Sequence, residues 1–345
     1  MKTGIANLPL HTGSCPAWLF KRMVKLSYFI TEIIIDELGT DLFLKRLSDP
    51  FFFQSLGCVL GFDWHSSGVT TTVCGALKEA LNKNNSSLKV AGGKGKSGLN
   101  TLNEIENSNL TTAKIECLKR ASKLAAKVDN ALVQDNYNLY HHCIFFNENG
   151  KWAVIQQGLN NNNNYARRYH WLSNSVNSYV TEPHSAICCD IKQNQMLNLT
   201  SKICKETQKV SVDIVKDFKH LTLKPEHEIL RHELTSYTIK TLKAAYEIQP
   251  NNYEDLISIK GIGAKTLRAL ALISELVYGT ENSWSDPAKF SFAHGGKDGF
   301  PYPVNKKCYD QTIKILKNAV NDSRIGNKDK VQALKRLNSF INHKK

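Results

Sequence analysis

The stretch that decides the fold reads HCIFFNENGKWAVIQQG and spans residues 142–158. Two apolar runs flank the pair Asn149-Gly150. An Asn-Gly pair between such runs is typical of a tight β-hairpin, because both residues tolerate the left-handed backbone that the turn requires. We therefore expect an antiparallel hairpin, and a small sheet around it, in the middle of the chain.

The sequence on both sides of this hairpin has the spacing of helices. Apolar residues recur at helical intervals in residues 16–39, 40–62, 69–82 and 111–133, with a break before Pro50. Ser66 or Ser67 is expected to cap the third of these helices with its hydroxyl. From about residue 205 to the end the pattern is again helical. The predicted fold class is α+β, mostly helical, with the small sheet in the middle and an all-α C-terminal half.

Two breaks divide the chain. Residues 82–103 are rich in Asn, Ser, Gly and Lys without an apolar period, which predicts a loop or hinge. A boundary near residue 205 predicts an N-terminal α+β domain at 1–204 and an all-α domain at 205–345.

Charge and cysteine usage limit the function classes. The 345 residues carry a formal charge of +14, from 45 Lys and Arg against 31 Asp and Glu. Such a surface favours an anionic partner, nucleic acid first and a membrane surface second; the alternative is that lysine only keeps the chain soluble. The nine cysteines contain no C-x-x-C pair, and no secretory signal or bilayer-spanning run is visible. We expect free thiols and a cytoplasmic protein that binds no membrane.

A second stretch points to function. YEDLISIKGIGAKTLRALALISEL, residues 253–276, divides into a short helix, a turn at Lys260–Gly263 and a longer helix that starts near Ala264. Gly261 and Gly263 leave no side chain to keep a phosphate away, so backbone amides at the start of the second helix can donate to its oxygens. Lys265 adds a mobile positive charge.

This stretch resembles the helix-hairpin-helix module of DNA repair and processing proteins, which grips a phosphate backbone without reading the base sequence. The resemblance implies binding through Lys260, Gly261, Ile262, Gly263 and Lys265, to DNA rather than RNA; the alternative is two helices and a turn that only fill a core. Arg167 and Arg168, next to aromatic residues in YARRYHW, are expected to add backbone contacts. The alternative is a solvated sheet edge with a buried tryptophan.

Two enzymatic hypotheses remain beside a purely binding module. The first is a metal-dependent nuclease in which Asp63, His65, His141 and His142 supply ligands or transfer protons. The alternative is a turn before a capped helix, in which Asp63 and His65 only hydrogen-bond the backbone. The sequence does not specify its ion, and a divalent cation such as Mg²⁺ or Mn²⁺ is the natural expectation.

The second hypothesis follows the resemblance to base-excision glycosylases that carry the module. There a lysine matching Lys265 attacks the sugar, assisted by an aspartate at about the spacing of Asp286. The alternative is that Lys265 only contacts phosphate.

Several further stretches together resemble a domain-of-unknown-function family of archaea and bacteria (DUF763-like). The resemblance covers nearly the whole chain and brings no activity with it, but it implies that the two halves occur as a unit. The stretches are MKTGIANLPLHTG, LSDPFFFQSLGCVLGFDWHSSGVTTTVCGALKEAL, AGGKGK, WAVIQQG, ARRYHW and FSFAHGGKDGFPYPV.

Overall fold

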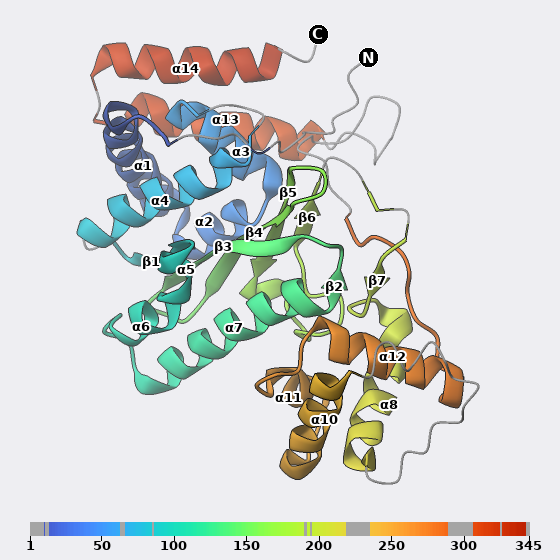
Figure 1. Cartoon of the computed structure of the whole chain (residues 1–345). Helices are drawn as coiled ribbons and strands as arrows, with labels where there is room; N and C mark the ends of the chain where they lie inside the picture. The colour runs from blue at the N-terminus through green and yellow to red at the C-terminus, as the bar shows by residue number, and fades with distance from the viewer. Residues whose placement is uncertain are drawn as a thin grey trace.

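A five-stranded antiparallel sheet lies between two layers of helices in the computed structural model of the chain (Figure 1). The fold class is α+β, as the sequence predicted. The structure describes residue 10 and residues 14–62, 66–84, 86–189, 192–193, 195–218, 235–288, 306–324 and 326–342.

Along the described chain, helices α1–α4 precede strand β1, helices α5–α7 and strands β2–β7 follow it, and helices come last. The helices are α1 (Ala17–Leu38), α2 (Thr40–Leu47), α3 (Pro50–Leu60), α4 (Gly68–Lys83), α5 (Lys96–Leu99), α6 (Thr101–Glu106), α7 (Thr112–Ala131), α8 (Lys205–Lys216), α10 (Ser236–Ile248), α11 (Tyr253–Ser258), α12 (Ala264–Tyr278), α13 (Lys306–Asp322) and α14 (Asn327–Asn342). The strands are β1 (Leu88–Lys94), β2 (Val133–Gln134), β3 (Asn138–Asn147), β4 (Trp152–Asn160), β5 (Tyr165–Leu172), β6 (Ala186–Cys188) and β7 (Leu197–Asn198).

The predicted hairpin forms the centre of the sheet, whose strand order is β1-β3-β4-β5-β6. Strands β3 and β4 pair in the register Phe146 to Trp152, and the Gly150 amide donates to the Asn147 carbonyl over 3.0 Å. Gly150 has φ +78°, the left-handed backbone that the Asn-Gly signal implied. The hairpin prediction is confirmed. The small sheet β2-β7 is separate.

Helices α1–α4 cover one face of the sheet and end where the sequence indicated. The Asp49 carboxylate accepts the Phe51 amide at 2.8 Å and caps α3, while Pro50 occupies the first helical position, where its missing amide costs nothing. The predicted cap of α4 is wrong: Ser67 is the N-cap residue, but its side chain makes no capping hydrogen bond.

Helix α7 covers the opposite face, and its core continues without a break into α8 and α10–α12. Helices α13 and α14 return to the first layer, where Leu316, Val320 and Leu337 pack with α1 and α3 (Figure 1). The division at residue 205 stays a prediction, but the packing does not follow it, because the last two helices share the core of the N-terminal half.

The described residues of the segment 82–103 do not form a loop, contrary to the prediction. They form β1, α5 and α6, and β1 pairs with β3 along its whole length. Lys78 donates to the Gly92 carbonyl at 2.7 Å and to Glu104, which accepts the Gly92 amide at 2.8 Å. The pairing of β1 with β3 and this partly buried ion pair order the segment, although its glycine-rich sequence alone does not predict regular structure.

Gly92 is a position in this segment where a side chain does not fit. It has φ +98°, and a Cβ there would lie 2.2 Å from the His142 carbonyl oxygen. A side chain would therefore force β1 away from β3.

Among the described residues, no helix combines the length and the apolar character needed to cross a lipid bilayer.

We expect Gly92→Ala to lower the free energy of unfolding by about 3 kcal/mol, from backbone strain plus overpacking. Gly279→Ala is the matched control, because Gly279 also has a positive φ, +70°, but a Cβ there meets nothing within 4 Å. It should cost only about 1 kcal/mol. Urea denaturation measures both, and equal losses would contradict the close approach of β1 to β3.

Candidate functional site

The turn between α11 and α12 occupies residues 259–263, where the sequence predicted a turn at Lys260–Gly263. Gly261 has φ +94°, Ile262 is fully buried, and α12 begins at Ala264. The positive φ of Gly261 favours glycine, and the space is tight, because a Cβ there would lie 3.2 Å from the Thr241 methyl group of α10. The buried isoleucine holds the turn on the core while its two glycines stay partly exposed.

In the first turn of α12, backbone amides lack an acceptor within the described chain, although Thr266 itself is buried. No side chain caps the helix, and no acidic residue lies in its first turn. The first amide that reaches back into the turn is that of Leu267, which donates to the Gly263 carbonyl over 3.0 Å. The amides of residues 264–266 therefore have no acceptor among the described residues. Lys260 and Lys265 are both exposed beside them.

Side chains of neighbouring elements hydrogen-bond this turn. Lys127 of α7 donates to the Ile262 carbonyl, and burial lowers the pKa of this lysine. Gln134 of β2 donates to the Ala264 carbonyl at 2.9 Å and accepts from Arg268 at 2.9 Å. On the other side, Tyr237 of α10 is 64% exposed, with its hydroxyl near Gly261. The start of α12 thus lies beside two exposed lysines and an exposed tyrosine.

The two neighbouring histidines of β3 point to opposite faces of the sheet, as alternation along a strand requires. His142 faces α7, where its Nδ1 lies 2.8 Å from Gln156 and its Nε2 lies 2.8 Å from Ser122. Because the Gln156 amide nitrogen donates to Asp129, its oxygen must accept from Nδ1 of His142, and Ser122 then donates to Nε2. His142 therefore belongs to a closed polar network.

Asp129 is the centre of that network. It is fully buried and accepts hydrogen bonds from Gln156, from the Trp171 indole at 3.0 Å and from His184. These contacts join α7 to β4, β5 and the segment before β6.

Arg168 faces the first helical layer and is fully buried, which corrects the expectation of a surface arginine. It donates to Gln54 at 3.0 Å and to Thr70 at 3.3 Å, and it lies 4.6 Å from the centre of the Phe53 ring. Its cross-strand neighbour Gln157 donates to the Ser67 carbonyl at 2.8 Å and accepts from Thr70. Burial argues against direct contact between Arg168 and a nucleic acid.

Arg167 faces the α7 side and is also fully buried, which corrects the same expectation. It donates to both oxygens of Asp286, at 3.1 and 2.7 Å, and to Asp135 at 2.9 Å. Asp286 also accepts the backbone amides of Gln193 and Ala288, at 2.7 and 2.9 Å. This carboxylate is therefore committed to an internal ion pair, whereas Lys265 is exposed at the start of α12.

Two carboxylates share the single guanidinium of Arg167, and both are buried. Burial raises the pKa of Asp135 to about 6, although Arg167 and the Tyr169 hydroxyl, which donates at 2.7 Å, act in the opposite direction.

His141 faces the first helical layer, where it meets two cysteines that the sequence analysis did not select. Ligand atoms of Cys74 on α4 and of His141 and Cys143 on β3 all lie within 4.8 Å of one another. Burial, with His142, Lys94 and Arg168 nearby, lowers the pKa of His141 to about 3, so its imidazole is neutral. The available signal was the spacing of His141 and Cys143, because residues two apart share one face of a strand.

Asp63 and His65 lie outside the described residues. Of the four residues in the nuclease hypothesis, the two that are described thus face opposite sides of the sheet.

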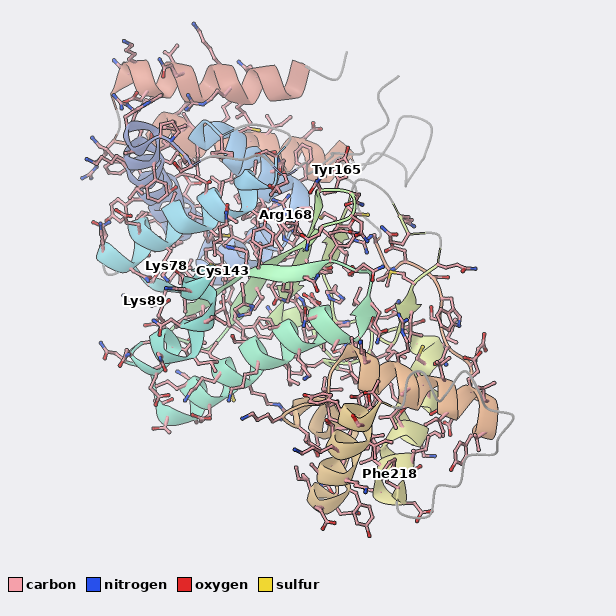
Figure 2. All side chains as sticks on the ribbon, viewed as in Figure 1. Lys78, Lys89, Cys143, Tyr165, Arg168 and Phe218 are labelled. Carbon is pink, nitrogen blue, oxygen red and sulfur yellow. The ribbon has the colours of Figure 1, made fainter. Side chains whose placement is uncertain are left out.

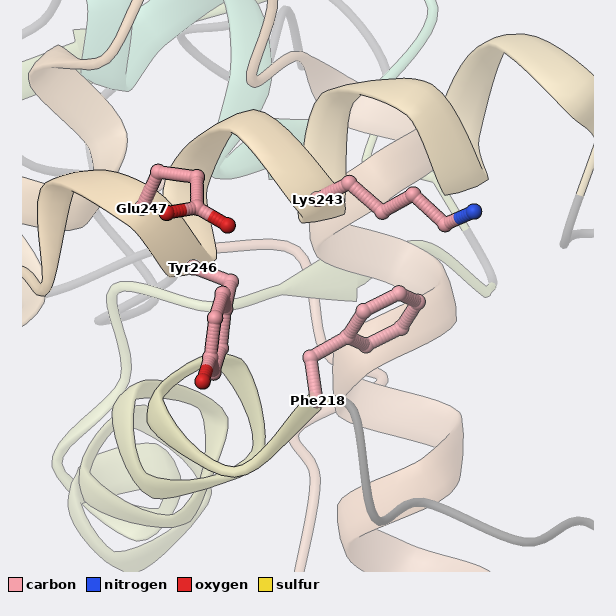
Figure 3. Close-up of a pocket in the computed structure, with 4 residues that line it drawn as sticks. All are labelled: Phe218, Lys243, Tyr246 and Glu247. Carbon is pink, nitrogen blue, oxygen red and sulfur yellow. The ribbon is translucent and has the colours of Figure 1, made fainter.

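A surface pocket of about 370 Å³ between α8 and α10 is lined by Phe218, Lys243, Tyr246 and Glu247 (Figure 3). No residue predicted to form a site lines it.

Residues 4–304 match the family model described as "Protein of unknown function (DUF763)". The chain therefore belongs to this family. No curated protein and no solved structure matches it.

We expect Asp286→Ala to lower the free energy of unfolding by about 3–5 kcal/mol, because it leaves the buried Arg167 charge without one of its carboxylates. Glu79→Gln is the matched control, since it breaks the exposed pair with Lys83 and should leave stability unchanged. Thermal unfolding followed by circular dichroism makes the comparison. An Asp286→Ala protein as stable as the wild type would contradict the structural role of this carboxylate.

The raised pKa of Asp135 makes stability depend on pH. Since the folded carboxyl binds its proton more tightly than the unfolded one, its contribution is full below about pH 4 and is lost as pH rises through about 6. Asp135→Asn should remove this part of the pH dependence. Unfolding free energies from urea titrations between these pH values test it, and an unchanged slope would contradict the assignment.

Proposed function

For this chain of the DUF763 family, we propose that the turn at residues 260–265 binds the phosphate backbone of DNA without reading its sequence. The observation that carries the proposal is the uncapped start of α12. A 15-residue helix presents its first amides beside Gly261 and Gly263, with exposed lysines on both sides of the turn. Such a helix start donates hydrogen bonds to phosphate and places the positive end of the helix dipole against it.

Three features support a polymeric ligand over a single small anion. The chain has a formal charge of +14, which attracts a polyanion over a wide surface. Lys260 and Lys265 lie on opposite sides of the glycines, so each can reach a different phosphate. Tyr237, exposed beside Gly261, offers a flat surface for a sugar or a base. The resemblance of the turn to the helix-hairpin-helix module favours DNA over RNA.

With this proposal we also propose a role in DNA repair or processing, because the turn resembles the module of proteins with that role. Binding is better supported than either catalytic hypothesis. Asp286, needed by the glycosylase hypothesis, forms an ion pair with Arg167 and accepts hydrogen bonds from two backbone amides. His141 and His142, needed by the nuclease hypothesis, point away from each other.

The sharpest test is Ala264→Pro. Proline is well accommodated at the first position of a helix, and Gly263 is extended, with φ −135° and ψ −175°, as a residue before proline should be. The variant should fold normally while losing one donor amide. We expect duplex affinity to fall about tenfold to a hundredfold, the value of one hydrogen bond to a charged group.

A second test removes charge and leaves the backbone intact. Lys260→Gln with Lys265→Gln should reduce the dependence of log affinity on log salt by about one for each phosphate that the variant no longer neutralises. The control is Lys328→Gln with Lys335→Gln, which changes the same charge on exposed positions of α14, at the opposite end of the molecule in Figure 1.

Fluorescence anisotropy at several salt concentrations measures both tests, on single-stranded and duplex DNA of two unrelated sequences and on RNA. Equal affinity of wild type and Ala264→Pro, with both proteins folded, would overturn the assignment of the turn. An equal salt slope in the two lysine pairs would show that only net charge matters. A clear preference for RNA would contradict the choice of DNA.

A further inference from the structure

A cluster of soft metal-ligand atoms lies in the core of the first helical layer. Cys74 projects from α4, and His141 and Cys143 project from β3, with Cys74 and His141 each 1% exposed and Cys143 fully buried. Their ligand atoms all lie within 4.8 Å of one another. Figure 2 labels Cys143 in this interior layer, together with Arg168.

The imidazole of His141 has no hydrogen-bond partner on either nitrogen within the described chain. The other histidines of the sheet region each have at least one hydrogen-bond partner. His142 is bonded at both nitrogens, His184 bonds Asp129, and His170 lies 3.2 Å from the Leu47 carbonyl. A buried polar ring without partners is unfavourable, and an apolar side chain would fill the same space without that cost. The two cysteine sulfurs beside the ring suggest that its nitrogens serve as metal ligands.

From this arrangement we propose that Cys74, His141 and Cys143 bind one thiophilic metal ion of the Zn²⁺ or Cu⁺ class. Zinc takes sulfur at about 2.3 Å and imidazole nitrogen at about 2.0–2.1 Å, so three such donors around one ion lie about 3.5–4 Å apart. Donor atoms already within 4.8 Å need only small side-chain rotations to reach these distances. On binding, each thiol releases its proton to solvent and coordinates as thiolate.

The donor set decides the class of ion. Thiolate and imidazole select Zn²⁺ and Cu⁺, whereas Mg²⁺ and Mn²⁺ prefer oxygen ligands. The cluster is therefore a different site from the Mg²⁺ or Mn²⁺ centre of the nuclease hypothesis. Two thiolates neutralise Zn²⁺ and leave one negative charge with Cu⁺. Burial and the neighbouring Cys143 raise the pKa of the Cys74 thiol, and the Arg168 guanidinium acts in the opposite direction.

Coordination number distinguishes the two ions. Three protein donors satisfy Cu⁺, while Zn²⁺ takes a fourth ligand, for which a water molecule is the usual choice. In both cases the ion would join α4 to the central strand β3, so its role is to stabilise the first helical layer. This inference does not depend on the DNA-binding proposal, which concerns the turn before α12 on the other side of the sheet.

The test begins with the full-length wild-type protein, purified under reducing conditions without chelator, and its metal content by mass spectrometry. The metal is then removed with a chelator and replaced by Zn²⁺, Cu⁺ with reductant, Co²⁺, Mg²⁺ or Mn²⁺ in separate titrations. We expect one thiophilic ion per chain, a higher unfolding temperature with that ion, and a sulfur-to-cobalt charge-transfer band with Co²⁺. Mg²⁺ and Mn²⁺ should have no effect.

Variants locate the site. Cys74→Ser and Cys143→Ser should each remove the charge-transfer band and the temperature shift, and His141→Gln should weaken binding. Cys117→Ser is the matched control, because Cys117 is an exposed free cysteine on α7, and it should bind metal as the wild type does.

The wild-type titration is decisive even if a variant fails to fold. Saturable binding of Zn²⁺ or Cu⁺ that survives Cys117→Ser supports the proposal, and the preferred ion identifies the coordination. Absence of binding and of any temperature shift in reduced, folded wild type would overturn it. A Cys74–Cys143 disulfide in protein purified without reductant, together with no metal binding after its reduction, would also overturn it, in favour of a redox pair.

Discussion

The structure depends on one constraint: its central sheet is covered by helices on both faces, so every polar side chain that the strands bury must find a partner inside the protein. Strands β4 and β5 carry Gln156, Gln157, Arg167, Arg168 and His170, all of them buried. A polar group in such a place is stable only when it is hydrogen-bonded, and a charge only when it is also compensated. The two layers of helices are held in place partly by meeting this demand.

On the α7 face, carboxylates from distant segments of the chain bond the polar side chains that the strands bury. Asp129 of α7 collects donors from two strands and from His184, while Asp135 and Asp286 neutralise Arg167. The Arg167 ion pair ties the segment after α12 to the sheet. The turn before α12 is held by Lys127 and Gln134 in the same way. The candidate phosphate-binding turn is therefore hydrogen-bonded to α7 and β2, which suits a site that binds through backbone amides.

On the other face the partners include neutral groups of the first helical layer, and one buried ring keeps no partner in the described chain. Arg168 and Gln157 bond Gln54, Thr70 and the Ser67 carbonyl, but His141 keeps two nitrogens without partners in the described chain. The His141 ring has no partner among the described side chains around it. The neighbouring thiols of Cys74 and Cys143 are the reason for proposing a metal ion as that partner.

The sequence by itself determined the elements with strong local signals: the helices of residues 17–38 and 112–131, the break at Pro50, the hairpin at Asn149-Gly150, and the turn at Gly261. Each depends on backbone preferences and on the spacing of apolar residues, which act over a few positions. Only the tertiary structure decided that residues 88–106 are ordered, because β1 is stabilised by β3 and by the ion pair of Lys78 with Glu104. It also decided that Arg167 and Arg168 are internal and that Cys74 meets His141. Charge and spacing alone do not reveal which side chains the two helical layers bury, because burial is set by contacts between residues far apart in the chain.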